Sequence, residues 1–360
     1  MRTPVEAAET TPTVVLTPEA RRRPLTRLFA TALVVAGFVG GGLLSGPGFQ
    51  SVLLLTVALS VYSMAYGVLL GYANQPSLGQ SLFFGLGSYA LILPLSRATF
   101  GFWPAMGVAL ALGLVGGAVV GSLVARMTEA YLVIVTALFA ATAGLAANNF
   151  TSITGGTGGL SAEIPTIHIG PLSVSVYETV PQYLFILAFA VITFVILAAL
   201  VRSPIGKVWQ SIRENEPRAQ SIGYNTHLYK VAAFAICSGF TALGGALYAI
   251  VLRYTSSDSF ALTWSVFPFL WVIIGGSGTL LGPVIGVALF TIFQFYVSKV
   301  WTNYLILFGL VMLAILRWAP GGIVGYAREL GTTGLASRAS ELGRAWLARR
   351  FGRAPERRER

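Results

Sequence analysis

The chain has 360 residues, of which 55% are hydrophobic and 10% are charged, with a formal net charge of +11. Soluble proteins carry about 25% charged residues, so this composition excludes an ordinary soluble domain and predicts a protein embedded in a lipid bilayer. Most Lys and Arg lie beside apolar segments, at 21–27, 202–230 and 317–360. That placement follows the positive-inside rule of membrane proteins, so nucleic acid is not an expected partner.

Apolar segments recur along the whole chain. Spanning the hydrocarbon core takes about 20 residues, so the shorter segments are expected to be broken or partial crossings. We predict an all-α polytopic membrane protein with about ten transmembrane segments. These segments are 27–44, 51–71, 80–97, 104–125, 130–147, 182–201, 231–252, 265–281, 283–298 and 303–317.

The charges also predict the orientation of the chain. Residues 148–181 contain no Lys or Arg, so they are expected outside, and ten crossings then leave both termini in the cytoplasm. Treating 265–298 as one hairpin gives the same sidedness, so the number of crossings stays open there. We expect a disordered cytoplasmic tail at 1–26, a transmembrane domain at 27–317 and a basic cytoplasmic tail at 318–360. In that last tail, residues 335–351 form either a helix on the inner membrane surface or a loosely ordered segment.

The stretch GYANQPSLGQSLFFGLGSYA at 71–90 interrupts an apolar region with helix breakers and uncharged polar residues. Gly71, Pro76 and Gly79 break the helix, and non-helical backbone at membrane depth must be buried in protein or line a wet cavity. The polar side chains therefore either contact a passing solute or satisfy the freed backbone groups. We assign four of them to a translocation path: Asn74, Gln75, Ser77 and Gln80.

A second breaker-rich stretch, VIIGGSGTLLGPVIG at 272–286, lies in the other half of the chain. Gly282 and Gly286 form a GxxxG pair, as do Gly113 and Gly117, and the usual role of such pairs is close helix packing. Interrupted hydrophobic segments in both halves of a transporter also indicate a pathway between two structural repeats. We therefore expect 272–286 to be the counterpart of the stretch at 71–90.

Nothing in the sequence predicts a source of energy within this chain. Asp and Glu residues lie outside the apolar centres, which disfavours a proton relay, and no GxxxxGK[ST] phosphate-binding loop is present. His168 and His227 fall in different predicted compartments and Cys237 is the single cysteine, so no metal or cofactor is expected. We expect no enzymatic activity, and a pump of this kind must receive its energy from another subunit.

The longest polar stretch between spans is RSPIGKVWQSIRENEPRAQSIGYNTHLYK at 202–230. Pro217 suits the first turn of a helix, and Gly223 suits a left-handed C-terminal cap. A short exposed helix here would fit the groove of a partner subunit. The alternative is a solvated loop that follows the positive-inside rule.

Six segments resemble one family in the same order. IRENEPRAQSIG is similar to the coupling segment of the branched-chain amino acid ABC transporter permeases, in the second of their two membrane subunits. The other five are GYANQPSLGQSLFFGLGSYA, EAYLVIVTALFA, TGGTGGLSAEIP, FTALGGALYA and VIIGGSGTLLGPVIG. The resemblance covers residues 50–325. Urea and other amide permeases share much of the pattern, so the substrate stays open.

The resemblance implies a type II-like ABC importer permease fold in the plasma membrane. It also implies three kinds of partner: a second permease subunit, two cytoplasmic ATPase subunits and an extracytoplasmic substrate-binding protein. The residues assigned to coupling with the ATPase are Arg213, Glu214, Glu216, Arg218, Ala219 and Gly223. Pro217-Arg218 departs from the family pattern, where small or aliphatic residues are more common, and this shifts the expected start of the coupling helix.

The glycine-rich loop TGGTGGL at 154–160 has two interpretations. Consecutive glycines present backbone N–H groups to an anion or form a tight turn. With the resemblance, we place Thr154 and Thr157 near the outer end of the translocation path. The expected function is a permease subunit for branched-chain or related amino acids. The alternatives are a urea or short-amide permease, a stand-alone channel or a sodium-coupled carrier.

Overall fold

The structure, a computed structural model, describes residues 37–38, 40–42, 46–169, 172–175, 177–300, 303, 306–310, 313, 317 and 322–325. The expected tail at 1–26 lies outside the described residues, and so does the tail at 318–360 apart from 322–325. The first and last expected spans, 27–44 and 303–317, are described only in part.

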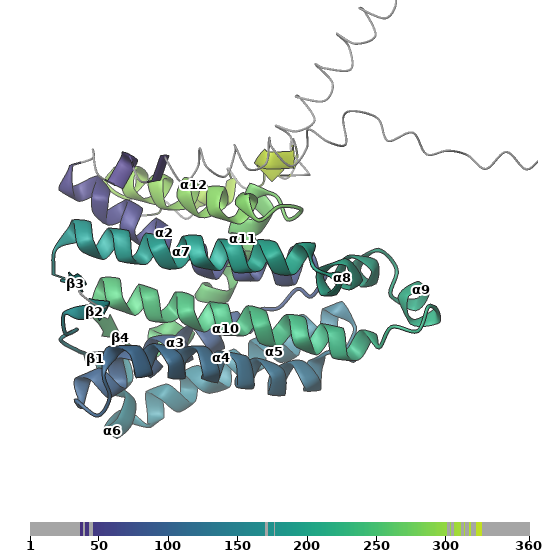
Figure 1. Cartoon of the computed structure of the whole chain (residues 1–360), viewed down its shortest axis with the longest axis horizontal. Coiled ribbons are helices and arrows are strands. Elements are labelled where there is room, and N and C mark those ends of the chain that lie inside the picture. The colour runs from purple at the N-terminus through teal and green to yellow at the C-terminus, as the bar shows by residue number, and fades with distance from the viewer. Residues whose placement is uncertain are drawn as a thin grey trace, which may run out of the picture.

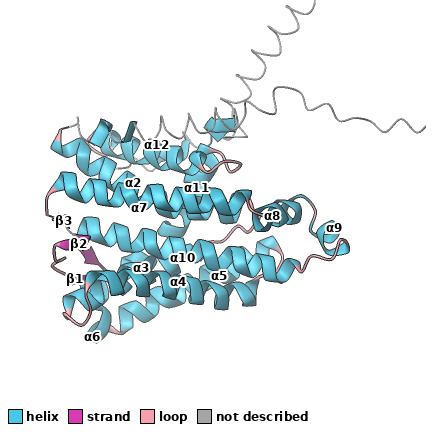
Figure 2. Cartoon of the chain, viewed as in Figure 1, coloured by secondary structure: helices cyan, strands magenta, loops and turns pink. Residues whose placement is uncertain are grey.

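Helices dominate the described chain (Figures 1 and 2). The main helices are α2 (Pro47–Gly71), α3 (Gln80–Ser96), α4 (Phe102–Val124), α5 (Glu129–Asn149), α7 (Thr179–Arg202), α10 (Thr226–Leu252), α11 (Thr263–Gly275) and α12 (Leu281–Val297). Five of them, α2, α4, α5, α7 and α10, are long and apolar enough to cross a membrane, whereas α3, α11 and α12 are shorter apolar helices. The predicted all-α membrane fold with some partial crossings is confirmed.

The bundle has two unlike ends (Figure 1). At one end, α8 (Pro204–Glu214) and α9 (Glu216–Ser221) project beyond the other helices; we call residues 204–225 the knob and this end the knob end. The opposite end, the strand end, carries two small antiparallel pairs and short helical turns. These elements are α6 (Thr151–Thr154), η1 (Gly156–Gly158), β1 (Leu160–Ser161) with β4 (Tyr254–Thr255), β2 (Ile167–Ile169) with β3 (Leu172–Val174), and η2 (Ser257–Phe260).

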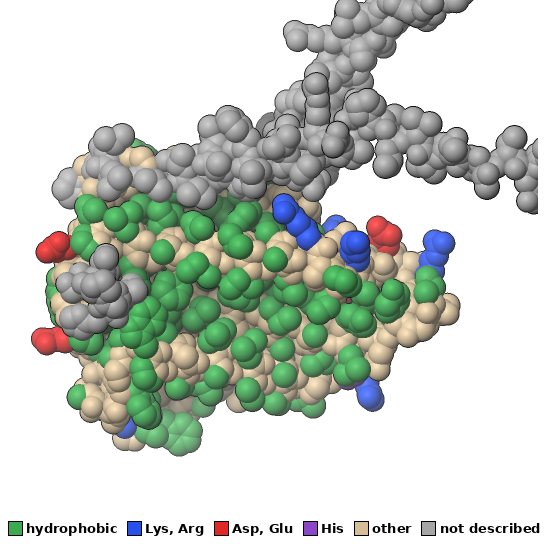
Figure 3. Space-filling model, in the orientation of Figure 1, with side chains coloured by type: hydrophobic (Ala, Val, Ile, Leu, Met, Phe, Trp, Pro, Cys, Tyr) green, Lys and Arg blue, Asp and Glu red, His purple; other side chains and the backbone are tan. Residues whose placement is uncertain are grey.

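The surface between the two ends is apolar. In Figure 3, hydrophobic side chains cover the sides of the helices, while Lys and Arg gather around the knob end. Large side chains that face outward include Val115 and Val119 of α4, Leu138 of α5 and Val195 of α7, each more than half exposed. Such a belt is unfavourable in water and fits a bilayer, which is consistent with a multi-pass membrane protein.

Two parts of the chain, α2–α3 and α10–α11, each consist of a long helix, a connection that turns back, and a shorter helix, and they run in opposite directions. Helix α2 runs from the strand end to the knob end, residues 72–79 turn back into the bundle, and α3 returns toward the strand end (Figure 1). Helix α10 runs from the knob end to the strand end, residues 253–262 turn back, and α11 runs toward the knob end. Opposed repeats with interrupted helices are a common transporter design.

The two interrupted segments meet where α3 and α11 begin. The Ser81 N–H donates to Ser265 Oγ at 2.9 Å, and the Ser81 hydroxyl donates to the Phe260 carbonyl at 3.1 Å. All three residues are buried. The starts of both short helices therefore lie in contact inside the protein.

The segment 272–286, expected to be the counterpart of 71–90, is interrupted by a tight turn at 276–280 between α11 and α12. Gly276 ends α11 with a φ of 109°, a conformation that L side chains rarely adopt. A further interruption lies at 253–262, between α10 and α11, and starts at Arg253 with a φ of 53°.

Helix α10 is the central packing partner of the bundle. Its backbone lies so close to α3 and α4 that glycines are required at the contacts. A Cβ on Gly117 would lie 2.6 Å from Ser238 Cβ, and one on Gly87 would overlap the Ala242 carbonyl. The packing role predicted for Gly113 and Gly117 is confirmed, since both face α10. Cys237, on the same helix, is fully buried and has a free thiol.

Candidate translocation path and coupling surface

Ser77 holds the non-helical backbone of 72–79 in place. Its carbonyl accepts a hydrogen bond from the Tyr66 hydroxyl at 2.9 Å, and its Oγ accepts from the Gly79 N–H at 3.2 Å. Thr136 of α5 adds a third bond, because its Oγ1 accepts from the Leu78 N–H at 3.2 Å. Buried backbone groups outside helices need such partners. Of the two interpretations given above for the polar residues of this stretch, Ser77 fits backbone satisfaction.

Gln75 and Gln80 behave differently from Ser77. Their side chains are 2% and 0% exposed, and the amide oxygen and nitrogen of both have no hydrogen-bond partner among the described residues. Leaving a buried polar group without a partner costs about 1–3 kcal/mol. The non-helical stretch and the first residue of α3 therefore each carry a buried amide with unused donors and acceptors.

Asn74, the residue before Gln75, lies near the knob end. Its backbone is left-handed, with a φ of 50°, a conformation that Asn tolerates better than most residues. Its Nδ2 donates to Glu129 Oε1 at 2.6 Å. Because Glu129 is the first residue of α5, this bond ties the start of the stretch to the end of a neighbouring helix.

Thr154 and Thr157 lie at the strand end, and the structure does not bring them together with Gln75 and Gln80. The Thr154 hydroxyl donates to the carbonyls of Phe150, at 2.9 Å, and Ala147. Thr157 is exposed. The next residue, Gly158, accepts a bond from the Tyr254 hydroxyl at 3.1 Å, so the glycine-rich loop is a closed turn fastened to β4.

Local sequence signals build the knob. Ser203 caps α8, and Asn215 Oδ1 caps α9 by accepting from the Arg218 N–H at 3.0 Å. Pro217 lies in the first turn of α9, and Gly223 follows its end with a φ of 98°. The short helix predicted between Pro217 and Gly223 is confirmed.

The residues assigned to coupling divide into buried and exposed groups. Ala219 is 2% exposed and packs with Val208 and Ile212, and Glu216 Oε2 accepts from Lys230 Nζ at 2.6 Å. These two support the knob from within. Glu214 and Arg218 are exposed. Sequence reasoning missed Ile222, whose side chain is 70% exposed at the end of α9; an isoleucine beside a helix-ending glycine was the available signal.

Arg213 joins the knob to both halves of the bundle. Its guanidinium donates to the carbonyl of Gly71, the last residue of α2. Gly71 itself touches the turn between α11 and α12, because a side chain there would overlap the Ser277 carbonyl. The Tyr72 hydroxyl also donates to the Gly278 carbonyl at 3.4 Å. Three segments thus meet at Gly71: α8, the interrupted stretch and the turn at 276–280.

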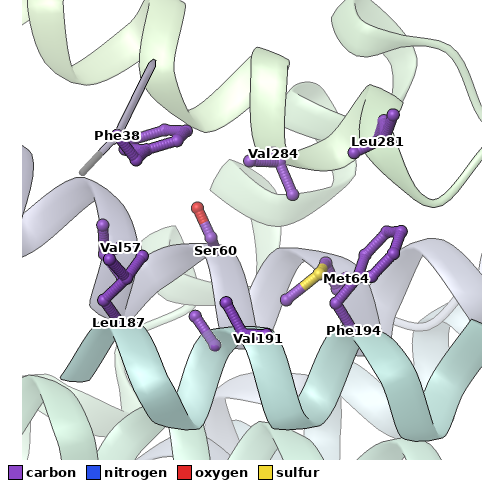
Figure 4. A pocket seen from close by; sticks show the side chains of 10 residues that line it. Phe38, Val57, Ser60, Met64, Leu187, Val191, Phe194, Leu281 and Val284 are labelled. Atoms are coloured by element: carbon purple, nitrogen blue, oxygen red, sulfur yellow. The ribbon is translucent and has the colours of Figure 1, made fainter. Parts of the chain in front are cut away.

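A small apolar hollow lies on the side of the bundle, between α2, α7 and α12 (Figure 4). It holds about 60 Å³ and is lined by side chains such as Met64, Phe194 and Val284. Its single polar side chain, Ser60, donates its hydroxyl to the Thr56 carbonyl at 2.7 Å. The hollow therefore offers no polar contact for a solute.

Comparison with known proteins identifies the family. The model of the family described as branched-chain amino acid transport system / permease component matches residues 48–316, well over half of the chain. The chain belongs to this family. The match confirms the resemblance drawn from the six sequence segments, and it makes the protein a membrane permease and a component of a multi-subunit transport system.

Curated relatives of the permease carry consistent names. It is 25% identical over 323 residues to the high-affinity branched-chain amino acid transport system permease protein LivM of Escherichia coli (strain K12), covering 84% of this chain and 76% of that protein. The LivM of Salmonella typhimurium gives the same identity and coverage. A probable branched-chain amino acid permease LivM of Methanocaldococcus jannaschii is 29% identical over 155 residues, covering 39% of this chain and 45% of that protein. No solved structure matches the permease.

Proposed function

We propose that the permease forms the membrane path of an ATP-driven importer for branched-chain amino acids. Its family and the names of its relatives support this class of substrate. The observation that carries the proposal is the contact of the knob with the interrupted stretch, through Arg213 and Gly71. An exposed cytoplasmic helix that contacts an interrupted membrane helix is suited to transmit a movement of a cytoplasmic partner to the residues of the translocation path.

The proposed assembly contains a second permease subunit, two cytoplasmic ATPases and an extracytoplasmic substrate-binding protein. The knob end faces the cytoplasm, because Lys and Arg gather there and the positive-inside rule favours that side (Figure 3). Both termini then lie in the cytoplasm as well. Ile222, Arg218 and Glu214 form the exposed surface offered to an ATPase groove.

The proposed mechanism moves the interrupted stretch. When the ATPases close, the knob shifts, and Arg213 transmits the shift to the end of α2 and to residues 72–79. Gln75 and Gln80 then present neutral amide donors and acceptors to the carboxylate and ammonium groups of a zwitterion. A neutral site can pass such a substrate onward, whereas a fixed charge in a low-dielectric interior would hold it strongly.

Reconstitution tests the proposed function. Proteoliposomes that contain both permeases, the ATPases and the binding protein should accumulate L-leucine only when ATP is supplied, and this chain alone should accumulate none. Uphill uptake by this chain alone under a sodium gradient would contradict the proposal. If the complex instead takes up urea and not L-leucine when ATP is supplied, its substrates are short amides rather than branched-chain amino acids.

Replacing both buried amides should reduce transport without destabilising the protein. In Gln75→Met with Gln80→Met, which keeps the size of both side chains, we expect the initial rate of ATP-driven L-leucine uptake to fall at least tenfold. Thermal stability in detergent should stay equal to wild type or rise, because neither amide makes a hydrogen bond that folding depends on. Ser77→Ala is the matched control and should lower stability, since its hydroxyl bonds the Gly79 N–H. An unchanged uptake rate and KM in the double variant would assign both amides to structure alone.

Removing the guanidinium of Arg213 should uncouple ATP hydrolysis from transport. In Arg213→Gln, the complex should still assemble and hydrolyse ATP, while the number of L-leucine molecules imported per ATP falls about tenfold. The reason is that the guanidinium of Arg213 donates to the carbonyl of Gly71 in α2, and the shorter side chain of glutamine does not reach that carbonyl. Lys207→Gln removes a positive charge from an exposed position of the same helix and should leave the ratio unchanged. Equal ratios in the two variants would remove Arg213 from the coupling route.

A further inference from the structure

An aromatic cavity lies between α2, α10, α11 and α12. Its volume is about 400 Å³, within the range of about 300–1,000 Å³ typical of small-molecule pockets. Leu252, the last residue of α10, and Ser298, which follows α12, both line it, so the cavity extends to the strand end. Its aromatic wall consists of Tyr248, Trp264, Phe267, Trp271, Phe290 and Phe295.

The cavity also has polar groups, and none of the described residues that line it is charged. Helix α12 adds Thr291, Gln294 and Ser298, spaced by three and four residues so that they share one face of the helix. An aromatic wall thus stands against a neutral polar stripe, an arrangement that suits an amphipathic ligand.

Trp264 lies between this cavity and the start of α3. Its ring stacks on Phe84 with centroids 4.9 Å apart and packs against Tyr248 at the same distance. The Trp264 carbonyl accepts from the Tyr62 hydroxyl at 2.7 Å. The next residue, Ser265, bonds Ser81, which directly follows Gln80. One aromatic layer therefore lies between the cavity and the first turn of α3, which begins at Gln80.

We propose that this cavity receives the aliphatic side chain of the amino-acid substrate on its way from the strand end to Gln80. The aromatic wall covers the aliphatic side chain, while the polar stripe of α12 faces the ammonium and carboxylate groups. The inference rests on the proposed function and narrows it, because urea has no aliphatic part for the wall to cover. A lipid acyl chain would also fill an apolar space, but it has no polar group to pair with the stripe of Thr291, Gln294 and Ser298.

A cavity-filling variant tests the proposal in the complete reconstituted complex. Leu55 of α2 lines the cavity, so Leu55→Trp should reduce its volume. We expect initial uptake of L-leucine to fall at least tenfold and that of the smaller L-valine to fall much less, which lowers the leucine-to-valine ratio at least threefold. Leu112→Trp, on the exposed face of α4, is the matched control and should leave both rates unchanged.

Several outcomes would overturn the proposal. If the cavity holds a lipid chain instead, Leu55→Trp displaces lipid and neither uptake rate changes. A merely structural effect lowers both rates equally and leaves the ratio at its wild-type value. Failure of the wild-type complex to import L-leucine would instead refute the proposed function itself, so the two failures are distinguishable.

A second variant decides the question if Leu55→Trp does not fold. Gln294→Leu keeps the size of a side chain that lines the cavity and removes its amide, so it should raise the KM for both L-leucine and L-valine at least threefold without changing their ratio. An unchanged KM in a folded Gln294→Leu complex would also overturn the proposal.

Discussion

A permease that carries Gly87→Leu should yield at least tenfold less folded protein than wild type. Gly87 of α3 faces the carbonyl of Ala242 in α10, and any side chain there would overlap that carbonyl. Overpacking a core costs about 1–3 kcal/mol when side chains can yield. Here the obstacle is the backbone of the central helix, so α3 would have to separate from α10.

The measurement is the amount of monodisperse protein recovered from membranes, by fluorescence-detected size-exclusion chromatography. Gly107→Leu makes the same change on α4, where no atom lies within 4 Å of an added Cβ, and it should match wild type. A wild-type yield for Gly87→Leu would show that α3 and α10 do not pack as described.

Ile222→Asp should abolish ATP-driven uptake while leaving the fold intact. Ile222 is 70% exposed at the end of α9, so this chain loses little packing when the side chain changes. A partner groove that covers it would lose an apolar contact and gain a buried charge. Interface hot spots cost about 2 kcal/mol or more when truncated, which corresponds to roughly a thirtyfold loss of affinity.

Co-purification of the ATPases with the permease measures this effect, together with L-leucine uptake in proteoliposomes. Gln210→Asp adds the same charge to an exposed position on α8 and should retain both the ATPases and uptake. Full retention of the ATPases by Ile222→Asp would exclude the tip of the knob from their interface.

Much of the fold could be predicted because apolar length determines where membrane helices form. The expected segments 51–71 and 182–201 differ from α2 and α7 by at most four residues at either end. Strong local signals, Pro217 and Gly223, also located the short helix of the knob. Each of these features depends on neighbouring residues along the chain.

Features that depend on distant contacts could not be predicted. Ser77 and Gln80 are both polar in sequence, but the Ser77 hydroxyl accepts from the Gly79 N–H whereas the Gln80 amide has no partner among the described residues. The interruption at 253–262 contains no Gly or Pro, so no breaker revealed it. Its position depends on the pairing of β4 with β1, a contact with residues synthesised about ninety positions earlier.

The sequence also could not predict which apolar residues of the knob are buried. Ala219 and Ile222 are three residues apart in one short segment, and both are apolar. Their exposure is opposite because Ala219 packs against α8 while Ile222 lies beyond the end of α9. A six-residue helix is too short for periodicity to distinguish its two faces.

The central place of α10 sets the order in which the protein can assemble. The glycine faces of α3 and α4 pack on residues 234–242 of α10, which the ribosome adds only after more than a hundred further residues. At 5–20 residues per second this delay is on the order of ten seconds. During that time those faces can lie against lipid tails, because their backbone groups are already bonded within each helix. The packing of α3 and α4 on α10 is therefore completed only after α10 has entered the membrane.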